Sequence, residues 1–155
     1  MNEQTCPCGH GQYATCCQPL HQGIASAQSA EQLMRSRYSA FAKHEIDYIV
    51  KTTALGQQKQ LGHAALDAWS RHNQWQKLEI LNSLPKLDKS HAMVEFKAYY
   101  FDGQENQIHH EQSYFVYHAD QWFFLDPTLP KTLSMKQICL CGSGKKFKHC
   151  CASFL

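Results

Sequence analysis

Apolar and polar positions along the chain predict a group of helices followed by a group of strands. Ser29 is a residue type favoured at a helix N-cap, and the apolar side chains after it fall near one helical face. Shorter helices are predicted over residues 45–52 and 64–73. The stretch between them, residues 54–62, is polar and rich in glutamine, so we expect a mobile loop there.

From Trp75 onward the apolar positions recur every second residue, which is the period of a strand. Strands are predicted over residues 77–81, 91–101, 108–118 and 121–125. Turn signals at Asp102-Gly103 and Ala119-Asp120 would join the last three as antiparallel neighbours. Helices followed by an antiparallel sheet make an α+β domain, here predicted over residues 29–127.

All eight cysteines lie in two clusters of one pattern, a cluster at each end of the chain. A Cys-x-Cys pair is followed, after a short loop, by two adjacent cysteines. Thiolates are soft ligands that suit zinc, and four of them can close a tetrahedral site. We therefore predict two zinc knuckles, residues 1–18 and 138–155, holding up to two zinc ions. The predicted ligands are Cys6, Cys8, Cys16, Cys17, Cys139, Cys141, Cys150 and Cys151.

Disulfides and free thiols are the alternatives for these cysteines. The repeated spacing and a reducing compartment favour metal over both. His10 and His149 lie beside the clusters, so each could replace a cysteine as ligand, although an exposed loop position is the simpler interpretation. Adjacent cysteines would need an irregular or helix-starting backbone to reach one ion, because neighbouring side chains diverge in regular structure.

The net charge and the apolar segments of the chain bear on whether a membrane or a nucleic acid is a partner. No apolar leader precedes Cys6 and no segment approaches the length of a membrane helix, so we expect a cytoplasmic protein without a membrane partner. The formal net charge is +2, and two zinc–tetrathiolate centres would change it to about −2. Net charge therefore gives no support for nucleic acid as a partner, although RNA phosphate stays open.

Local charge is different at the C-terminal cluster, where lysines gather without a nearby acidic residue. The glycines of Gly142-Ser143-Gly144-Lys145 are too close together for a phosphate loop, and no hydroxyl residue follows the lysine. We predict instead a surface for a partner. Its residues are Lys145, Lys146, Phe147 and Lys148.

A pocket between helices and sheet is the candidate small-molecule site. Glu111 and Ser113 alternate on one predicted strand with His109, so they share a face. Glu111 could pair with an arginine of the first helix, either as a catalytic base or, as we favour, as a structural ion pair. The pocket candidates are Arg35, Arg37, Tyr38, Glu111 and Ser113. His109 and His110 are interpreted as surface residues, and the tryptophans as core.

The segment from Cys139 to Cys151 resembles the SEC-C zinc motif in its glycines, lysines, aromatic residue and cysteines. That motif occurs in the C-terminal tail of the SecA translocation motor, where it is associated with binding the SecB chaperone. The resemblance implies zinc and a SecB-like or other secretion or ribosomal partner. The N-terminal copy has an inner loop one residue shorter, without lysines, so its zinc is expected but a shared partner is not implied.

The whole chain resembles the YchJ family of bacterial proteins, which carry such a motif at each end. The match rests on residues 33–38, Asp47-Tyr48 and residues 111–115 in the middle. The resemblance implies a central domain of the nuclear-transport-factor-two-like fold, a cone of helices packed on a curved antiparallel sheet. It implies no established biochemical activity.

These observations lead to one expectation and two alternatives. The expectation is a non-enzymatic zinc-binding adaptor that contacts a protein, or RNA, through its terminal knuckles. The first alternative is a small-molecule-binding protein or enzyme that uses the central pocket. The second, a redox or zinc-storage protein, requires thiols that release metal under mild oxidation.

Overall fold

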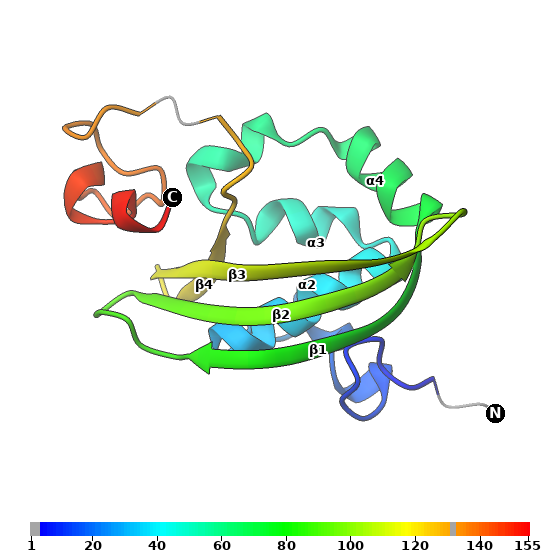
Figure 1. Cartoon of the computed structure of the whole chain (residues 1–155). Helices are drawn as coiled ribbons and strands as arrows, with labels where there is room; N and C mark the ends of the chain where they lie inside the picture. The colour runs from blue at the N-terminus through cyan, green and yellow to red at the C-terminus, as the bar shows by residue number, and fades with distance from the viewer. Residues whose placement is uncertain (1–3, 131–132) are drawn as a thin grey trace.

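A single antiparallel sheet with strand order β1-β2-β3-β4 is the framework of the chain (Figure 1). The structure, a computed structural model, describes residues 4–130 and 133–155. The strands are β1 (Gln74–Leu84), β2 (His91–Phe101), β3 (Asn106–His118) and β4 (Gln121–Leu125). The sheet is curved, and its long strands wrap around the helices.

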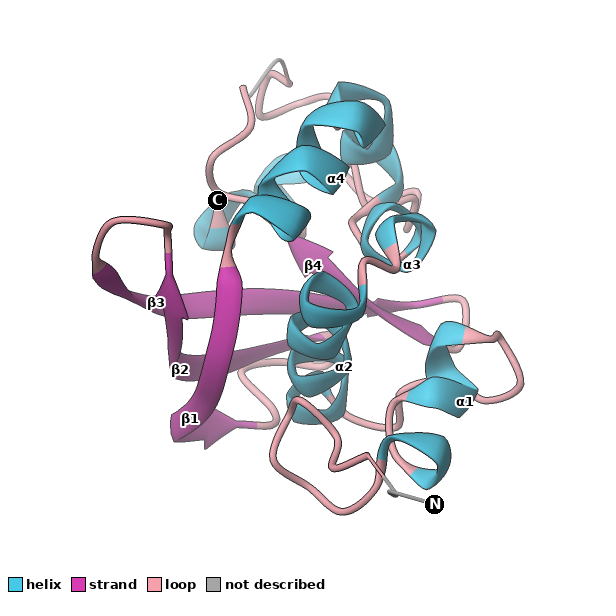
Figure 2. Cartoon of the chain, turned by 90° about the vertical axis from the view of Figure 1, so that its right-hand side faces the viewer, coloured by secondary structure: helices cyan, strands magenta, loops and turns pink. Residues whose placement is uncertain are grey.

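The larger helices lie together on one side of this sheet (Figure 2). They are α2 (Ala30–Lys43), α3 (Ile46–Lys51) and α4 (His63–His72), with the short α1 (Gln18–His21) before them. Short 3-10 helices are η1 (Tyr13–Thr15), η2 (Leu55–Gln60), η3 (Phe147–His149) and η4 (Ala152–Phe154). Among the described residues, no helix is long and apolar enough to cross a membrane.

The main core forms where α2 crosses the sheet. Leu33 and Tyr38 of α2 are buried in one cluster with Val94 of β2 and Phe115 of β3. Burying such side chains contributes roughly 1.5–3 kcal/mol each. This contact therefore supplies much of the stability and sets the distance between helices and sheet.

Local sequence signals account for where these elements begin and end. The hydroxyl of Ser29 accepts a hydrogen bond from the Gln32 amide at 3.1 Å, which confirms the predicted N-cap of α2. Ala119 and Asp120 have φ values of 51° and 63°. Two such residues make the tight turn that matches the twist of a hairpin, so β3 and β4 pair directly.

The structure confirms the α+β class with helices on a curved antiparallel sheet. Strands β2 and β4 have the predicted bounds, while β1 extends beyond the predicted residues 77–81. The prediction of a mobile loop over residues 54–62 is wrong, because this stretch contains η2. Gln57 is buried there, and its side chain donates to the Asp126 carbonyl at 2.9 Å and accepts from the Asp126 amide at 3.0 Å. The polar composition of residues 54–62 led to the prediction of a loop, but backbone hydrogen bonds hold this segment in place.

The two knuckles pack on different parts of the central domain, toward opposite ends of the molecule (Figure 1). The N-terminal knuckle contacts Leu78 of β1. The C-terminal knuckle packs on Val116, Phe123 and Leu125, whose side chains lie on the face of the sheet opposite to Phe115. Each knuckle therefore shares a small apolar core with the domain.

Helix η2 also contacts the C-terminal knuckle. The Gly56 amide donates to the Leu140 carbonyl at 2.6 Å. A Cβ atom at Gly56 would lie 2.8 Å from both the Cβ and the carbonyl oxygen of Leu140. Only glycine allows this approach of the two backbones.

We expect Gly56→Ala to loosen the C-terminal knuckle from the domain. Overpacking of this kind costs about 1–3 kcal/mol of unfolding free energy, and amide exchange over residues 135–155 should accelerate. Gly62→Ala is the matched control, since its Cβ would lie 3.6 Å from the nearest heavy atom, which is ordinary contact. Equal exchange rates in the two variants would contradict the prediction.

Candidate metal centres and a central cavity

Each cysteine cluster brings its four sulfur atoms to within 4.8 Å of one another. Cys8 and Cys16 sulfurs are 3.6 Å apart, and Cys141 and Cys150 sulfurs are 3.5 Å apart. A tetrahedral ion with sulfur ligands at about 2.3 Å requires sulfur–sulfur distances of about 3.8 Å. Each cluster could therefore hold one metal ion, and the cysteines are free thiols rather than disulfides.

The two knuckles use the same backbone turn to assemble these sulfurs. The Cys6 amide donates to the Gly11 carbonyl at 2.9 Å, as the Cys139 amide donates to the Lys145 carbonyl at 2.8 Å. A 3-10 turn follows, after which Cys16 has φ −107° and ψ −93°. The backbone of Cys150 is similar, with φ −133° and ψ −98°. This irregular backbone, which the adjacent cysteines were expected to need, directs both side chains of each pair toward the other two.

The electrostatics of the clusters also fit a bound cation. Burial, together with the hydrogen bond and charge of Cys8, raises the pKa of Cys16 to about 12. Burial raises the pKa of Cys150 to about 11, and the charge of Cys141 adds to the effect. Four thiols at these distances cannot all be thiolates unless a cation offsets their charge. His10 and His149 do not belong to either ligand set in the part of the chain described.

The N-terminal centre is fixed to helix α2. Arg35 donates from Nη1 to the Cys8 carbonyl at 2.9 Å and from Nε to Glu31 at 3.2 Å. The Cys6 sulfur lies 3.5 Å from the Ser39 hydroxyl. The placement of Arg35 in the central pocket is therefore wrong, since this side chain points from α2 toward the knuckle.

The C-terminal centre is fixed to strand β2 by His91, which the sequence did not single out. His91 is 1% exposed, and its Nε2 lies 3.3 Å from the Cys151 sulfur. Its Nδ1 lies 2.9 Å from an Asp88 oxygen, and its ring stacks on Phe154 with centroids 4.3 Å apart. A carboxylate–histidine–thiolate chain of this kind orients a metal ligand. No local pattern could reveal it, because His91 and Cys151 are far apart in the sequence.

Of the four residues predicted to form a partner surface on the C-terminal knuckle, three are exposed and one is buried. Lys145, Lys146 and Lys148 are exposed, but Phe147 is 4% exposed and belongs to the core beneath the knuckle. Phe147 is therefore a docking residue within the chain and not an exposed contact. Its aromatic ring anchors the loop that carries the lysines.

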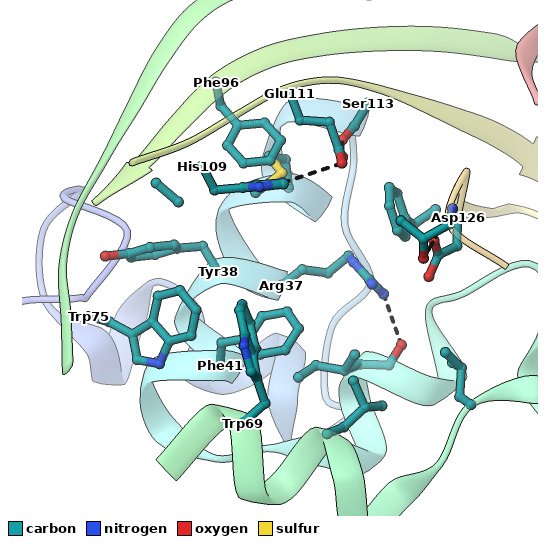
Figure 3. Close-up of a pocket in the computed structure, with 17 residues that line it drawn as sticks. Arg37, Tyr38, Phe41, Trp69, Trp75, Phe96, His109, Glu111, Ser113 and Asp126 are labelled. Atoms are coloured by element: carbon teal, nitrogen blue, oxygen red, sulfur yellow. Dashed lines mark hydrogen bonds and ion pairs between the residues drawn. The ribbon is translucent and has the colours of Figure 1, made fainter. Parts of the chain in front are cut away.

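A cavity of about 360 Å³ lies between the sheet and helices α2 and α4 (Figure 3). One end of it is aromatic, and the other carries charged and hydroxyl groups. The aromatic end is lined by Tyr38, Phe41, Trp69 and Trp75, whereas Phe96 lies beside His109. The polar end is lined by Arg37, His109, Glu111, Ser113, Asp126 and Thr128.

Glu111 makes its contacts with its own strand and not with an arginine. It accepts a hydrogen bond from Ser113 and lies 3.3 Å from Nε2 of His109. Burial alone would raise the pKa of Glu111, but these two contacts, with the nearby charge of Arg37, lower it below its ordinary value. The same contact raises the pKa of His109. His109 is half exposed, as a surface histidine would be, yet it lines the cavity.

Arg37 is buried and points into the cavity from α2. Its Nη1 donates to the Ile49 carbonyl at 2.8 Å and to the hydroxyls of Thr52 at 2.8 Å and Thr53 at 3.3 Å. Its guanidinium carbon lies 4.4 Å from the centre of the Phe124 ring. Burial lowers the pKa of Arg37 to about 10, so it stays charged at neutral pH.

We expect an NMR titration to give His109 a pKa above the ordinary value of about 6.5, and Glu111→Gln to bring it down. Because the pKa of His109 is raised and that of Glu111 is lowered, the pair stabilises the fold fully only between the two unfolded pKa values, and this stabilisation weakens as pH falls through the folded pKa of Glu111. It is also lost as pH rises through the folded pKa of His109. Glu95→Gln is the control, since Glu95 pairs with His110 at 2.7 Å on the opposite face. An unchanged His109 pKa in Glu111→Gln would contradict the pairing.

Comparison with known proteins agrees with this architecture. Residues 29–127 match the family model described as YchJ, middle NTF2-like domain, and residues 135–153 match the SEC-C motif. A UPF0225 protein of Actinobacillus succinogenes is 46% identical over 97% of this chain and 97% of its own. A UPF0225 protein of Haemophilus influenzae is 48% identical, covering 100% of this chain and 96% of its own.

Solved structures give the same assignment. The crystal structure of a SEC-C motif containing protein from Psychrobacter arcticus matches with a TM-score of 0.90 and 43% identity, over 98% of this chain and 97% of that one. The solution structure of a SEC-C motif containing protein from Rhodopseudomonas palustris has a TM-score of 0.72 and 38% identity. It covers 79% of this chain and 96% of its own. The chain belongs to the YchJ (UPF0225) family, with an NTF2-like middle domain and a C-terminal SEC-C motif.

Proposed function

We propose that the chain is a zinc-dependent adaptor whose C-terminal knuckle binds an acidic protein surface. The observation that carries this proposal is a patch of exposed lysines around exposed apolar side chains on the knuckle. We call it the C-terminal patch. Its members are Met135, Lys136, Ile138, Lys145, Lys146 and Lys148.

Zinc is the metal that suits the ligand set. Four cysteine sulfurs without an oxygen or nitrogen ligand are typical of structural zinc sites, which leave no position open for substrate. All four ligands of each set are at least partly buried. The centres therefore act as structural supports for the knuckles in this proposal.

The geometry of the C-terminal patch supports contact with a partner. Met135 is 57% exposed and Ile138 is 60% exposed, which is unusual for residues so close to a packed core. Ile138 pairs with Lys146 in a β-bridge, and the Lys148 amide donates to the Met135 carbonyl at 3.0 Å. The lysines make no ion pair with any described residue. Apolar and cationic groups are thus held side by side.

An acidic protein segment fits this patch better than RNA does. Nucleic-acid platforms combine cations with exposed aromatic faces on which bases stack, and the aromatic residue of this loop, Phe147, is buried. Exposed aliphatic side chains ringed by lysine match a partner that carries apolar and acidic residues together. A SecB-like chaperone or a ribosomal or secretion component would be a partner of this chemistry.

The metal would make this contact switchable by zinc supply. Residues 138–155 have few buried side chains besides their cysteines, so the knuckle depends on its ion to hold its shape. Residues 4–18 of the N-terminal knuckle carry no comparable patch of exposed lysines, and the Tyr13 ring is covered by Lys43 of α2 at 4.5 Å. In this proposal it is a structural support.

Elemental mass spectrometry on protein purified in a reducing buffer without chelator should find two zinc ions per chain. Cys139→Ser with Cys141→Ser should leave one, as should Cys6→Ser with Cys8→Ser, because each pair removes half of one ligand set. A melting temperature that falls on chelation would show that the ions support the fold. Metal-free protein with eight titratable thiols would refute the zinc assignment.

Charge reversal of the patch tests the partner surface. The variant Lys145→Glu, Lys146→Glu, Lys148→Glu should retain two zinc ions and the wild-type melting temperature but lose its specific protein partners in crosslinking pulldowns. Lys59→Glu, Lys86→Glu, Lys89→Glu is the matched control, since it makes the same charge change at exposed sites of the central domain.

Identical pulldown profiles for the two triple variants would rule out the patch as the contact surface. Loss of bound RNA, with no change in bound protein, would assign the patch to nucleic acid instead. Salt sensitivity separates these cases further, because phosphate contacts weaken steeply with ionic strength.

A further inference from the structure

We propose that the central cavity binds a small, mainly aromatic, uncharged molecule whose polar end both accepts and donates hydrogen bonds. An aromatic amide is the simplest example of that class. This is a second function, separate from the adaptor role of the C-terminal knuckle. It rests on the shape, the free hydrogen-bonding groups and the charge balance of the cavity.

The aromatic end is a cluster of rings in edge-to-face contact, which forms an apolar wall against which a flat ring could pack. Trp69 and Trp75 have ring centroids 5.1 Å apart, and Phe41 lies 5.5 Å from Trp69 with the rings nearly perpendicular. The cavity volume of about 360 Å³ lies within the range of small-molecule sites. Trp69 is 43% exposed although it contacts these rings, so part of its surface is available to an occupant of the cavity. Figure 3 shows the rings converging opposite the polar groups.

The polar end offers hydrogen-bond donors from Arg37. Nη1 makes all the hydrogen bonds that this guanidinium forms with described residues, which holds the group at a fixed angle. The Nε and Nη2 groups face accessible space, because no described side-chain nitrogen or oxygen is both fully buried and unpaired. Arg37 itself is nearly buried, so this space is the cavity. A carbonyl oxygen would accept from these groups.

The polar end also offers acceptors. Among the described residues Glu111 forms hydrogen bonds with Ser113 and His109 alone, and a carboxylate has about four acceptor positions. Asp126 accepts from the amide and hydroxyl of Thr128, at 2.9 and 2.6 Å. An N–H or O–H group next to the ligand's carbonyl would therefore find a carboxylate oxygen within the same end of the cavity.

Charge balance selects an uncharged ligand. Arg37 and His109 carry or can carry positive charge, and Glu111 and Asp126 carry negative charge, so the polar end is close to neutral. A carboxylate ligand at Arg37 would be repelled by both acidic residues. An ammonium ligand at the acids would be repelled by Arg37, which is too deeply buried for water to screen it.

Three probes with one ring and different polar ends test this assignment: 2-naphthamide, 2-naphthoate and 2-naphthylmethylamine. Binding is followed by the indole N–H signals in proton–nitrogen NMR spectra of the full zinc-loaded chain. Two of the three tryptophans line the cavity and Trp122 does not, so it is an internal control. The amide should shift Trp69 and Trp75 saturably and leave Trp122 unchanged. The two charged probes should bind at least tenfold more weakly.

Two variants locate the binding. Glu111→Gln should weaken 2-naphthamide about tenfold, and Trp69→Leu should weaken it by a similar factor while altering a half-exposed position that the fold tolerates. Glu95→Gln is the control, because Glu95 also pairs with a histidine and is as exposed as Glu111, at 21% against 20%, but lies on the opposite face of the sheet. Zinc content and a dispersed spectrum establish that each variant is folded.

Several outcomes would overturn the proposal. These are the absence of saturable shifts with all three probes, tighter binding of the acid or the amine, equal shifts of Trp122, or unchanged affinity in both cavity variants. None of them bears on the C-terminal patch, because its test uses lysines on the far side of the sheet. The two functions can therefore fail separately.

Discussion

The packing of helix α2 on the curved sheet is the contact on which the rest of the structure depends. Leu33 and Tyr38 are buried against the strands, and this fixes the rotation of the helix. Arg35 then points toward the N-terminal metal centre and Arg37 toward the cavity. Since Arg35 and Arg37 lie on nearly opposite sides of one helix, a rotation of α2 would displace the support of the N-terminal cysteine cluster and a cavity wall together.

The two faces of strand β3 also contribute to different sites. Glu111 and Ser113 line the cavity, whereas Tyr114 and Val116, on the opposite face, pack beneath the C-terminal knuckle. Strand β2 adds His91, which reaches the Cys151 sulfur. The alternation of side chains along a strand thus places the cavity and the C-terminal cysteine cluster on opposite sides of one sheet.

The cysteine ligand sets were predictable because they are local. Spacing within about a dozen residues dictated both clusters, and the repeated backbone turn made them alike. The supports of those clusters were not predictable, since Ser39 and His91 are distant in sequence from the sulfurs they contact. The contact of Arg35 was not predictable either. Its position on α2 led to the prediction that it lines the cavity, but it contacts the Cys8 carbonyl of the N-terminal knuckle, which is distant in sequence. Phe147 was likewise taken for an exposed contact, because its burial depends on β3 and β4.

Periodicity and spacing alone determined the α+β class, the positions of the main helices and strands, and the two four-thiol clusters, because each arises from residues close together in the chain. Burial, partner choice and orientation arose only when distant segments packed. That packing made Gln57 an interior residue of a 3-10 helix and paired Glu111 with His109 rather than an arginine. It also left Arg37 buried with no described carboxylate close enough for an ion pair, although the charges of Asp126 and Glu111 act on it. The physical reason is that contacts between residues distant in sequence set the environment of a side chain, and local sequence patterns carry no information about those contacts.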